Sequence, residues 1–226
     1  MGKIKVKIKL EIGFYDSFFF GGGNGLGEIQ SYMQKDIQGL PYISGSALKG
    51  SMAAYAAVLS DFFKSGKRRT ILFGTGGNAK GILYFENGKL EEKEAYEEMS
   101  GQTFGYKTQV SINPYTGTKS YKKLHTIETG GMGGLMRFQS SIHGYMEEET
   151  YKEDIAYILA TVRMIFALGG RRSSGLGWLN EPIACSYIAG IIGNPLWEKK
   201  KFDSGWRKGY VCKDYGSVKI TSYDRW

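Results

Sequence analysis

The chain has 226 residues, of which 42 % are hydrophobic and 23 % charged, the composition of a soluble globular protein with room for a substantial core. Its 33 glycines follow no Gly-X-Y period, which excludes a collagen-like chain. The net charge of +8 favours polyanionic partners without identifying one. No apolar run reaches the roughly 18 residues that a membrane span needs, and Cys185 and Cys212 are expected to be free thiols. We therefore expect a cytoplasmic protein with no membrane partner.

The first predicted element is a strand over Lys3–Ile12, in which apolar residues alternate with lysines. One face of this strand should be buried, and we interpret the lysine row on the other face as an ordinary solvated surface. Three phenylalanines, Phe18–Phe20, precede a glycine-rich loop at residues 21–27. A helix is predicted over Ala47–Lys64, with Ser44 and Ser46 as candidate N-caps.

A basic hairpin is predicted to project from the body at about residues 101–134. Residues 101–127 contain no acidic side chain, and lysines alternate there with tyrosines. The sequence Asn113-Pro114-Tyr115-Thr116-Gly117 is typical of a turn between two extended pieces.

The last third of the chain contains a second predicted helix, over Glu147–Leu168, preceded by a strand from Leu135 and followed by the sequence GGRRSSGLGW at residues 169–178. An extended segment follows up to Ile192, and a basic extension occupies about residues 195–226. The order of elements predicts an α+β fold in one domain, with a ferredoxin-like or RRM-like core and an inserted basic β-hairpin.

Two segments have the character of phosphate-binding sites. In GGRRSSGLGW, Arg171 and Arg172 supply charge, and Gly175 and Gly177 are expected to expose backbone N–H donors. The alternative for Gly169 is a helix-ending C′ residue. The segment Ser44–Gly50 places serines and a lysine at a helix N-terminus, which suits an anion, although simple capping also explains it. Rossmann and Walker signatures are absent.

Four segments together resemble the RAMP superfamily, the repeat-associated proteins of CRISPR systems. They are LPYISGSALKG, GGRRSSGLGWL, FFFGGG and NPYTGTKSYKKLHTIETG, and the resemblance extends to about Leu179. It implies an RRM-like palm that holds guide RNA, with the basic β-hairpin as a thumb. The chain would then be a guide-RNA-binding subunit of a type III (Csm-like or Cmr-like) effector complex, acting in antiviral defence. The implied partners are CRISPR guide RNA, target RNA, and other RAMP-type and large subunits.

The resemblance also implies two sets of RNA-binding residues. Guide RNA phosphates would be bound by Gly45, Ser46, Lys49, Gly169, Gly170, Arg171, Arg172, Ser173, Gly175 and Gly177. The thumb residues Thr116, Lys119, Lys122 and Lys123 would reach the guide–target duplex.

The chain departs from the family pattern where target-cutting members carry an aspartate, because Gln30 occupies that position. Phe19 and Ala53 replace a histidine and an arginine of the pattern. We therefore expect a subunit that binds RNA without cutting it, with no cofactor. If target RNA were cut, Mg²⁺ would be required, and Glu28 and Asp36 would be the candidate carboxylates.

Two further alternatives stay open. A metal-free nuclease that processes precursor CRISPR RNA would use His125 as general acid or base, whereas His143 is interpreted as structural. No Cys/His set has zinc-site spacing, so no structural metal is expected. A scaffold protein whose basic extension docks other subunits is the non-nucleic-acid alternative.

Overall fold

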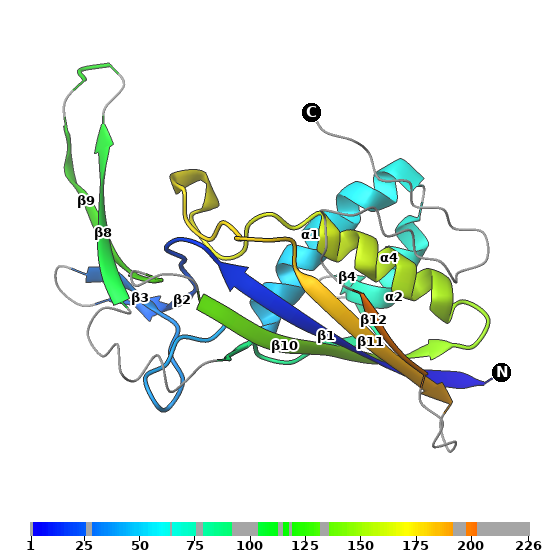
Figure 1. Ribbon diagram of the computed structural model, residues 1–226. Helices are drawn as coiled ribbons and strands as arrows, with labels where there is room; N and C mark the ends of the chain where they lie inside the picture. The colour runs from blue at the N-terminus through cyan, green and yellow to red at the C-terminus, as the bar shows by residue number, and fades with distance from the viewer. Residues whose placement is uncertain are drawn as a thin grey trace.

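The computed structural model describes residues 2–25, 29–63, 65–75, 79–91, 104–112, 115–117, 119–131, 136–191 and 198–202. A helix-covered sheet forms the body, and a long hairpin stands away from it at one end (Figure 1). Glu28 and most of the basic extension, residues 203–226, lie outside the described residues.

The main sheet has the predicted ferredoxin-like topology. Its four central strands are antiparallel neighbours in the order β11-β1-β10-β6, and helices connect β1 to β6 and β10 to β11. Two further strands, β12 and β7, pair with β11 and β10. The elements are β1 (Lys3–Phe14), α1 (Gly45–Phe63), β6 (Leu83–Phe85), β7 (Lys89–Leu90), β10 (Met136–Glu147), α4 (Tyr151–Arg163), β11 (Ala184–Ile191) and β12 (Glu198–Phe202).

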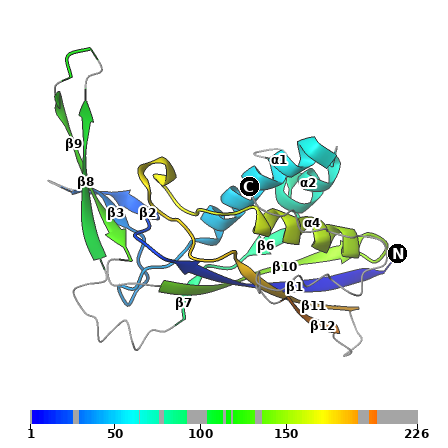
Figure 2. The same cartoon turned by 45° about the horizontal axis from the view of Figure 1, so that its top comes forward.

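The core lies between this sheet and the helices, all of which cover the same face of it (Figure 2). The period of two predicted for β1 is confirmed, because its aliphatic residues are buried and its lysines point the other way. Phe14, Phe18 and Phe138 close one end of the core, with ring centroids 4.5 Å apart for Phe14–Phe18 and 5.5 Å for Phe18–Phe138. The aromatic run therefore belongs to the core.

The helices differ in part from the sequence prediction. Helix α1 matches closely, and the hydroxyl oxygen of Ser44 accepts from the backbone N–H of Ala47 (3.3 Å) as an N-cap. Helix α4 is shorter than predicted, because β10 continues through Glu147 and the helix ends at Arg163. Its apolar periodicity continues to Phe166 in the sequence, but that residue packs outside the helix.

A shorter helix, α2 (Gly66–Phe73), was not predicted. Its Arg68 forms ion pairs with Glu153 and Asp154 on α4, which ties the two helices together. The two-stranded ribbon β4 (Gly74–Thr75) and β5 (Ala79–Lys80) follows it.

A second, four-stranded sheet contains the predicted hairpin. Its order is β2-β3-β9-β8, where β8 (Phe104–Ile112) and β9 (Lys119–Gly130) are the antiparallel arms of the hairpin. The glycine-rich segment expected to be a loop contributes β2 (Gly21–Asn24), and β3 (Ile29–Met33) pairs in parallel with β9. The hairpin is thus anchored by the strands that follow the phenylalanine run.

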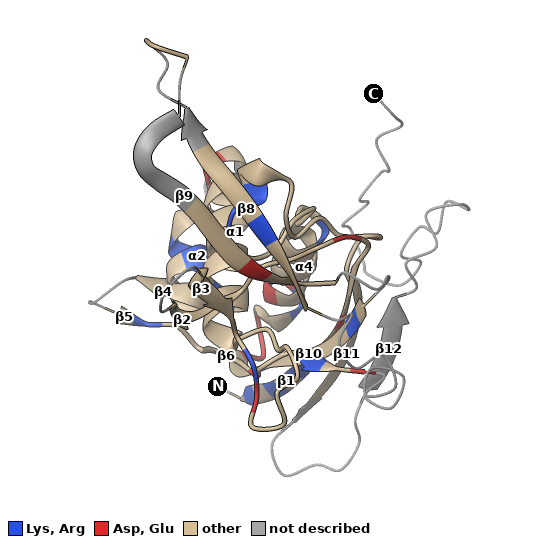
Figure 3. Cartoon of the chain, turned by 90° about the vertical axis from the view of Figure 1, so that its left-hand side faces the viewer, with Lys and Arg blue, Asp and Glu red and all other residues tan. Residues whose placement is uncertain are grey.

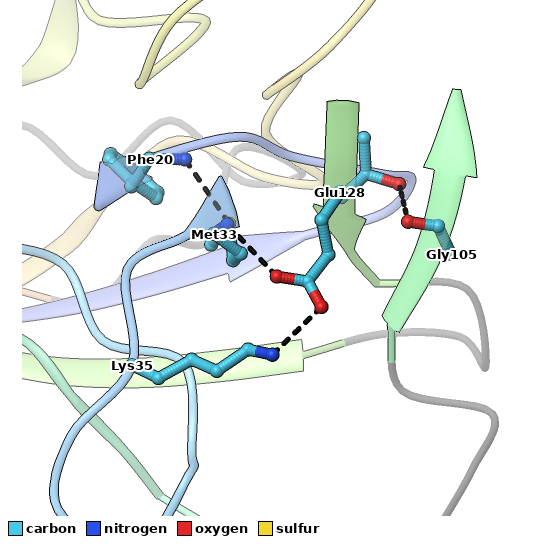
Figure 4. Close-up of polar contacts among 6 residues, drawn as sticks. Phe20, Met33, Lys35, Gly105 and Glu128 are labelled. Atoms are coloured by element: carbon cyan, nitrogen blue, oxygen red, sulfur yellow. Dashed lines mark hydrogen bonds and ion pairs between the residues drawn. The ribbon is translucent and has the colours of Figure 1, made fainter. Parts of the chain in front are cut away.

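The buried carboxylate of Glu128, on β9, connects this strand to the end of β3 and to Lys35 just after it (Figure 4). The side chain of Glu128, only 5 % exposed, accepts from the backbone N–H of Met33 (3.0 Å) and from the ammonium of Lys35 (2.8 Å). Lys35 also lies over the Phe104 ring, 4.1 Å from its centroid. Both carboxylate oxygens are therefore occupied, as a buried charge requires.

We expect Glu128→Gln to lower the free energy of unfolding by about 2–3 kcal/mol, because it leaves the partly buried Lys35 ammonium without its counter-charge. Urea denaturation followed by circular dichroism measures this loss. Glu86→Gln is the matched control, since the exposed Glu86 carboxylate lies 3.8 Å from Lys7, and its expected effect is within about 0.5 kcal/mol. Equal losses in the two variants would contradict the assignment.

Candidate nucleic-acid interface

The two predicted phosphate-binding segments meet at one open pocket. Its volume is about 340 Å³, and it lies between the first turns of α1 and the start of the GGRRSSGLGW loop. Its lining residues are mostly small or polar. They are Phe20, Gly21, Gln34, Ser44, Ala47, Gly50, Ser51, Ala54, Gly169, Gly170 and Arg172.

Helix α1 forms one wall of the pocket. The side chains that it presents there are small and recur at helical spacing: Ala47, Gly50, Ser51 and Ala54. A Cβ atom built on Gly50 would meet no other chain atom within 4 Å. No part of the described chain thus packs against this glycine. The helix thus gives up about 1 kcal/mol of propensity at a position that opens onto the pocket.

The opposite wall is the loop that follows α4. Arg171 has a left-handed backbone (φ 58°), the only described non-glycine residue with positive φ, and a short 3-10 helix follows at Arg172–Ser174. Because α4 ends at Arg163, Gly169 is not its C′ residue, and that interpretation was wrong. Gly169 is required instead because a Cβ there would lie 2.5 Å from the carbonyl oxygen of Phe19.

The expected exposed N–H donors of this loop are engaged within the chain. The N–H of Gly175 donates to the carbonyl of Arg172 (3.0 Å), and that of Gly177 donates to Ser17 (2.9 Å). The prediction that these two amides face a ligand was therefore wrong. The part of the loop that lines the pocket includes the exposed side chain of Arg172.

The start of α1 is also less open than predicted. The N–H of Gly45 donates to Asn87 Oδ1 (2.9 Å), and a Cβ on Gly45 would lie 2.2 Å from the Phe85 carbonyl oxygen. The Ser46 hydroxyl donates to that of Ser44 (3.1 Å). Lys49, partly buried, lies outside the pocket lining. Capping and packing thus explain Gly45 and Ser46, while Ser44 and Gly50 line the pocket.

The loop is joined to the base of the hairpin by two hydrogen bonds. Arg171 Nη1 donates to Gln109 Oε1 (3.0 Å), and Lys107 Nζ donates to the Ser174 carbonyl (2.8 Å). Both β8 residues were missed by the sequence analysis, because contacts over more than 60 residues leave no local pattern. Arg172 and Ser173 are exposed. Basic residues lie on β8 as well as on the palm (Figure 3).

The predicted thumb residues lie far from the pocket, at the outer end of the hairpin. Thr116 is exposed at the tip, beside Gly117 with its left-handed φ of 64°. Lys119, Lys122 and Lys123 lie on the outer part of β9. These lysines belong to the same projecting hairpin as Thr116, and none of them lines the pocket (Figure 1).

His125 lies on β9 opposite Gln109, the partner of Arg171. Burial, and secondarily the charge of Arg171, lower the pKa of the His125 imidazole. Its Nε2 atom is buried and has no hydrogen-bond partner among the described residues. Burial of this atom and the nearby Arg171 charge therefore favour the neutral imidazole.

Of the two candidate catalytic carboxylates, only Asp36 lies among the described residues. Asp36 Oδ1 accepts from the backbone N–H groups of Gln38 and Leu40 (2.9 Å each), so it orders a turn. Gln30 Oε1 accepts from the backbone N–H of Thr126, at the irregularity where β3 pairs with β9. No group of three or more metal-ligating side chains occurs in the part of the chain that the structure describes.

An aromatic cluster connects α1 with the chain on either side of the GGRRSSGLGW loop's glycine-rich turn. The ring centroids of Phe166 and Trp178 are 5.3 Å apart, and those of Tyr55 and Phe166 are 6.0 Å apart. Phe166 is 56 % exposed and Trp178 is 49 % exposed. The cluster thus offers flat, accessible apolar surface between α1 and the two segments that flank the loop.

A family model described as the RAMP superfamily matches residues 16–180, which include both walls of the pocket and the hairpin. The chain belongs to the RAMP superfamily. No curated protein matches the chain at a significant level. None of the described helices is long and apolar enough to cross a membrane.

Two solved structures with this RAMP fold are similar to the chain. One is a chain of the type III-B Cmr-beta complex bound to cognate target RNA, with a TM-score of 0.59 and 12 % identity over 80 % of this chain and 96 % of that one. The other is from the apo state of Cmr-beta, with a TM-score of 0.57 and 13 % identity over 84 % and 98 %. At such low identities the likeness concerns the fold.

The His125 environment predicts a pH-dependent stability. Because the folded-state pKa lies below the ordinary value of about 6.5, the unfolded chain binds more protons between these two values. The free energy of unfolding of the wild type should therefore fall, relative to His125→Gln, as pH is lowered from 7.5 to 5.5, by at most about 1.4 kcal/mol per pH unit. Urea denaturation of both proteins across this range measures it, and parallel curves would contradict it.

Proposed function

We propose that this RAMP protein is an RNA-binding subunit of a type III-like CRISPR effector complex and binds guide RNA along its backbone in the groove between α1 and the GGRRSSGLGW loop. The observation that carries the proposal is the meeting of two distant glycine-containing segments at one pocket that contains an exposed arginine. The superfamily membership and the likeness to Cmr-beta chains support it.

The chemistry of the pocket suits a phosphodiester backbone. Arg172 can offer its guanidinium fork to a phosphate, since no hydrogen bond or ion pair engages it among the described residues. The hydroxyls of Ser44 and Ser51 add polar contacts, and Gly50 lets a ribose or phosphate approach the helix. Phe166 and Trp178 can stack on a base that leaves the pocket. The hairpin would reach the guide–target duplex, with other effector subunits as neighbours.

A side chain at Gly50 should block the groove without harming the fold. Gly50→Leu meets no other chain atom at its Cβ and gains helix propensity, so thermal stability should be unchanged or higher. Affinity for single-stranded guide RNA, measured by fluorescence anisotropy, should fall at least about 10-fold, because the leucine fills the space that the RNA needs.

Gly66→Leu is the matched control for that experiment. Gly66 begins α2, its Cβ position is equally open, and it lies outside the pocket lining. RNA affinity should be unchanged in this variant. If Gly50→Leu bound RNA as tightly as Gly66→Leu does, the groove would not be the binding site.

Reversing the charge of Arg172 should weaken RNA binding in a salt-dependent way. Arg172→Glu loses one phosphate contact, so the slope of log affinity against log salt should decrease in magnitude by about 0.7. Arg163→Glu, at the exposed end of α4, makes the same charge change away from the pocket and should retain the wild-type slope. Identical slopes for both variants would place the phosphate contact elsewhere.

Binding without cleavage is the expected activity. Gln30 cannot replace a carboxylate, and its amide oxygen is used by the sheet, while Asp36 is held in a turn. Guide-bound protein incubated with complementary target RNA and Mg²⁺ should leave the target intact on a denaturing gel. Metal-dependent cutting lost in Glu28→Ala would instead identify a target nuclease, and metal-free cutting of precursor RNA lost in His125→Ala would identify a processing enzyme.

A further inference from the structure

The face of the main sheet that points away from the helices carries a row of lysines. Alternation along β1 places Lys3, Lys5, Lys7 and Lys9 on this outer face, and all but Lys7 are exposed. Neighbours in the row lie about 7 Å apart along the strand. The described helices all cover the other face (Figure 2).

Aromatic rings stand beside this row on the neighbouring strands. In the antiparallel register, Lys5 pairs with Tyr145 and Lys7 with His143, and His143 pairs in turn with Tyr84 on β6. Tyr84 is 59 % exposed and Tyr145 is 48 % exposed. The Tyr84 and His143 rings are stacked, with centroids 5.7 Å apart and planes inclined by 12°. The outer face thus combines cationic groups with flat, accessible rings.

Acidic residues neutralise only part of this face. Glu86 lies 3.8 Å from Lys7 and 3.6 Å from His143. Lys5 and Lys9 form no ion pair among the described residues, and the sequence places Glu11 next in the row. Two ammonium groups, on either side of Lys7 and about 14 Å apart along the strand, thus remain available to a polyanion.

We propose that this outer face, centred on Lys5, Lys9, Tyr84 and Tyr145, is a second binding site for single-stranded nucleic acid, separate from the groove. Ammonium groups would contact phosphates spaced along an extended strand, and the tyrosines would stack on bases without reading sequence. A protein partner is disfavoured because lysine is depleted at protein–protein interfaces. The proposal does not depend on RNA binding in the groove.

The test uses the full-length protein and fluorescein-labelled 20-nucleotide poly(A) and poly(U) RNA. Lys5→Glu/Lys9→Glu should weaken binding about 10-fold and reduce the salt slope by about 1.4, for two lost phosphate contacts. The control Lys67→Glu/Lys152→Glu makes the same charge change on exposed positions of α2 and α4 and should alter affinity less than about 2-fold.

Combination with the groove variant separates the two sites. In a Gly50→Leu background, residual binding should still depend on Lys5 and Lys9. Ultraviolet cross-linking of wild-type protein to 4-thiouridine RNA should yield modified peptides that contain Tyr84 or Tyr145, a readout that needs no substitution. Equal affinities for the two double variants, or cross-links absent from both tyrosines, would overturn the proposal whatever the groove binds. Competition for this face by a purified protein subunit, with no RNA effect, would assign it to a protein.

Discussion

The extended backbone of Ser17–Phe20 is the structural element on which the rest of the interface depends. Phe18 exchanges two hydrogen bonds with Gly130 at the end of the hairpin (3.0 and 2.9 Å). The carbonyls of Ser17 and Phe19 accept from Gly177 (2.9 Å) and Gly170 (2.8 Å) in the loop. Since the Phe18 ring is also fixed in the aromatic core, one segment places hairpin, loop and pocket relative to the sheet.

This arrangement explains why several glycines occur where they do. A Cβ on Gly130 would lie 2.7 Å from the Phe18 ring, and one on Gly177 would lie 1.9 Å from the Leu168 carbonyl oxygen. These glycines are required by close packing, whereas Gly50 has open space above it where it lines the pocket. The glycines thus have two kinds of role, since some allow close packing and Gly50 leaves space beside the pocket. Only the structure separates them, because both kinds look alike in the sequence.

Local regularities allowed much of the fold to be predicted. The period of two in β1, the Ser44 cap of α1 and the turn residues of the hairpin each depend on neighbours in the sequence. Contacts between distant segments were not accessible in this way. The bonds from Arg171 to Gln109 and from Lys107 to Ser174 span 62 and 67 residues. The extent of α4 was overestimated because apolar residues continue at helical spacing in the sequence after the helix has ended at Arg163.

The candidate site was therefore predicted in its location but not in its chemistry. Sequence reasoning treated Arg171 and Arg172 as equivalent phosphate ligands, yet their backbones place them differently. The left-handed conformation of Arg171, which costs about 1 kcal/mol or more, turns its guanidinium toward Gln109 on the hairpin. The next residue begins the short 3-10 helix and lines the pocket. One arginine thus bonds the loop to the hairpin, and the other lines the pocket. Because Arg171 and Arg172 are consecutive, a single peptide bond connects the residue bonded to the hairpin with the residue that lines the pocket.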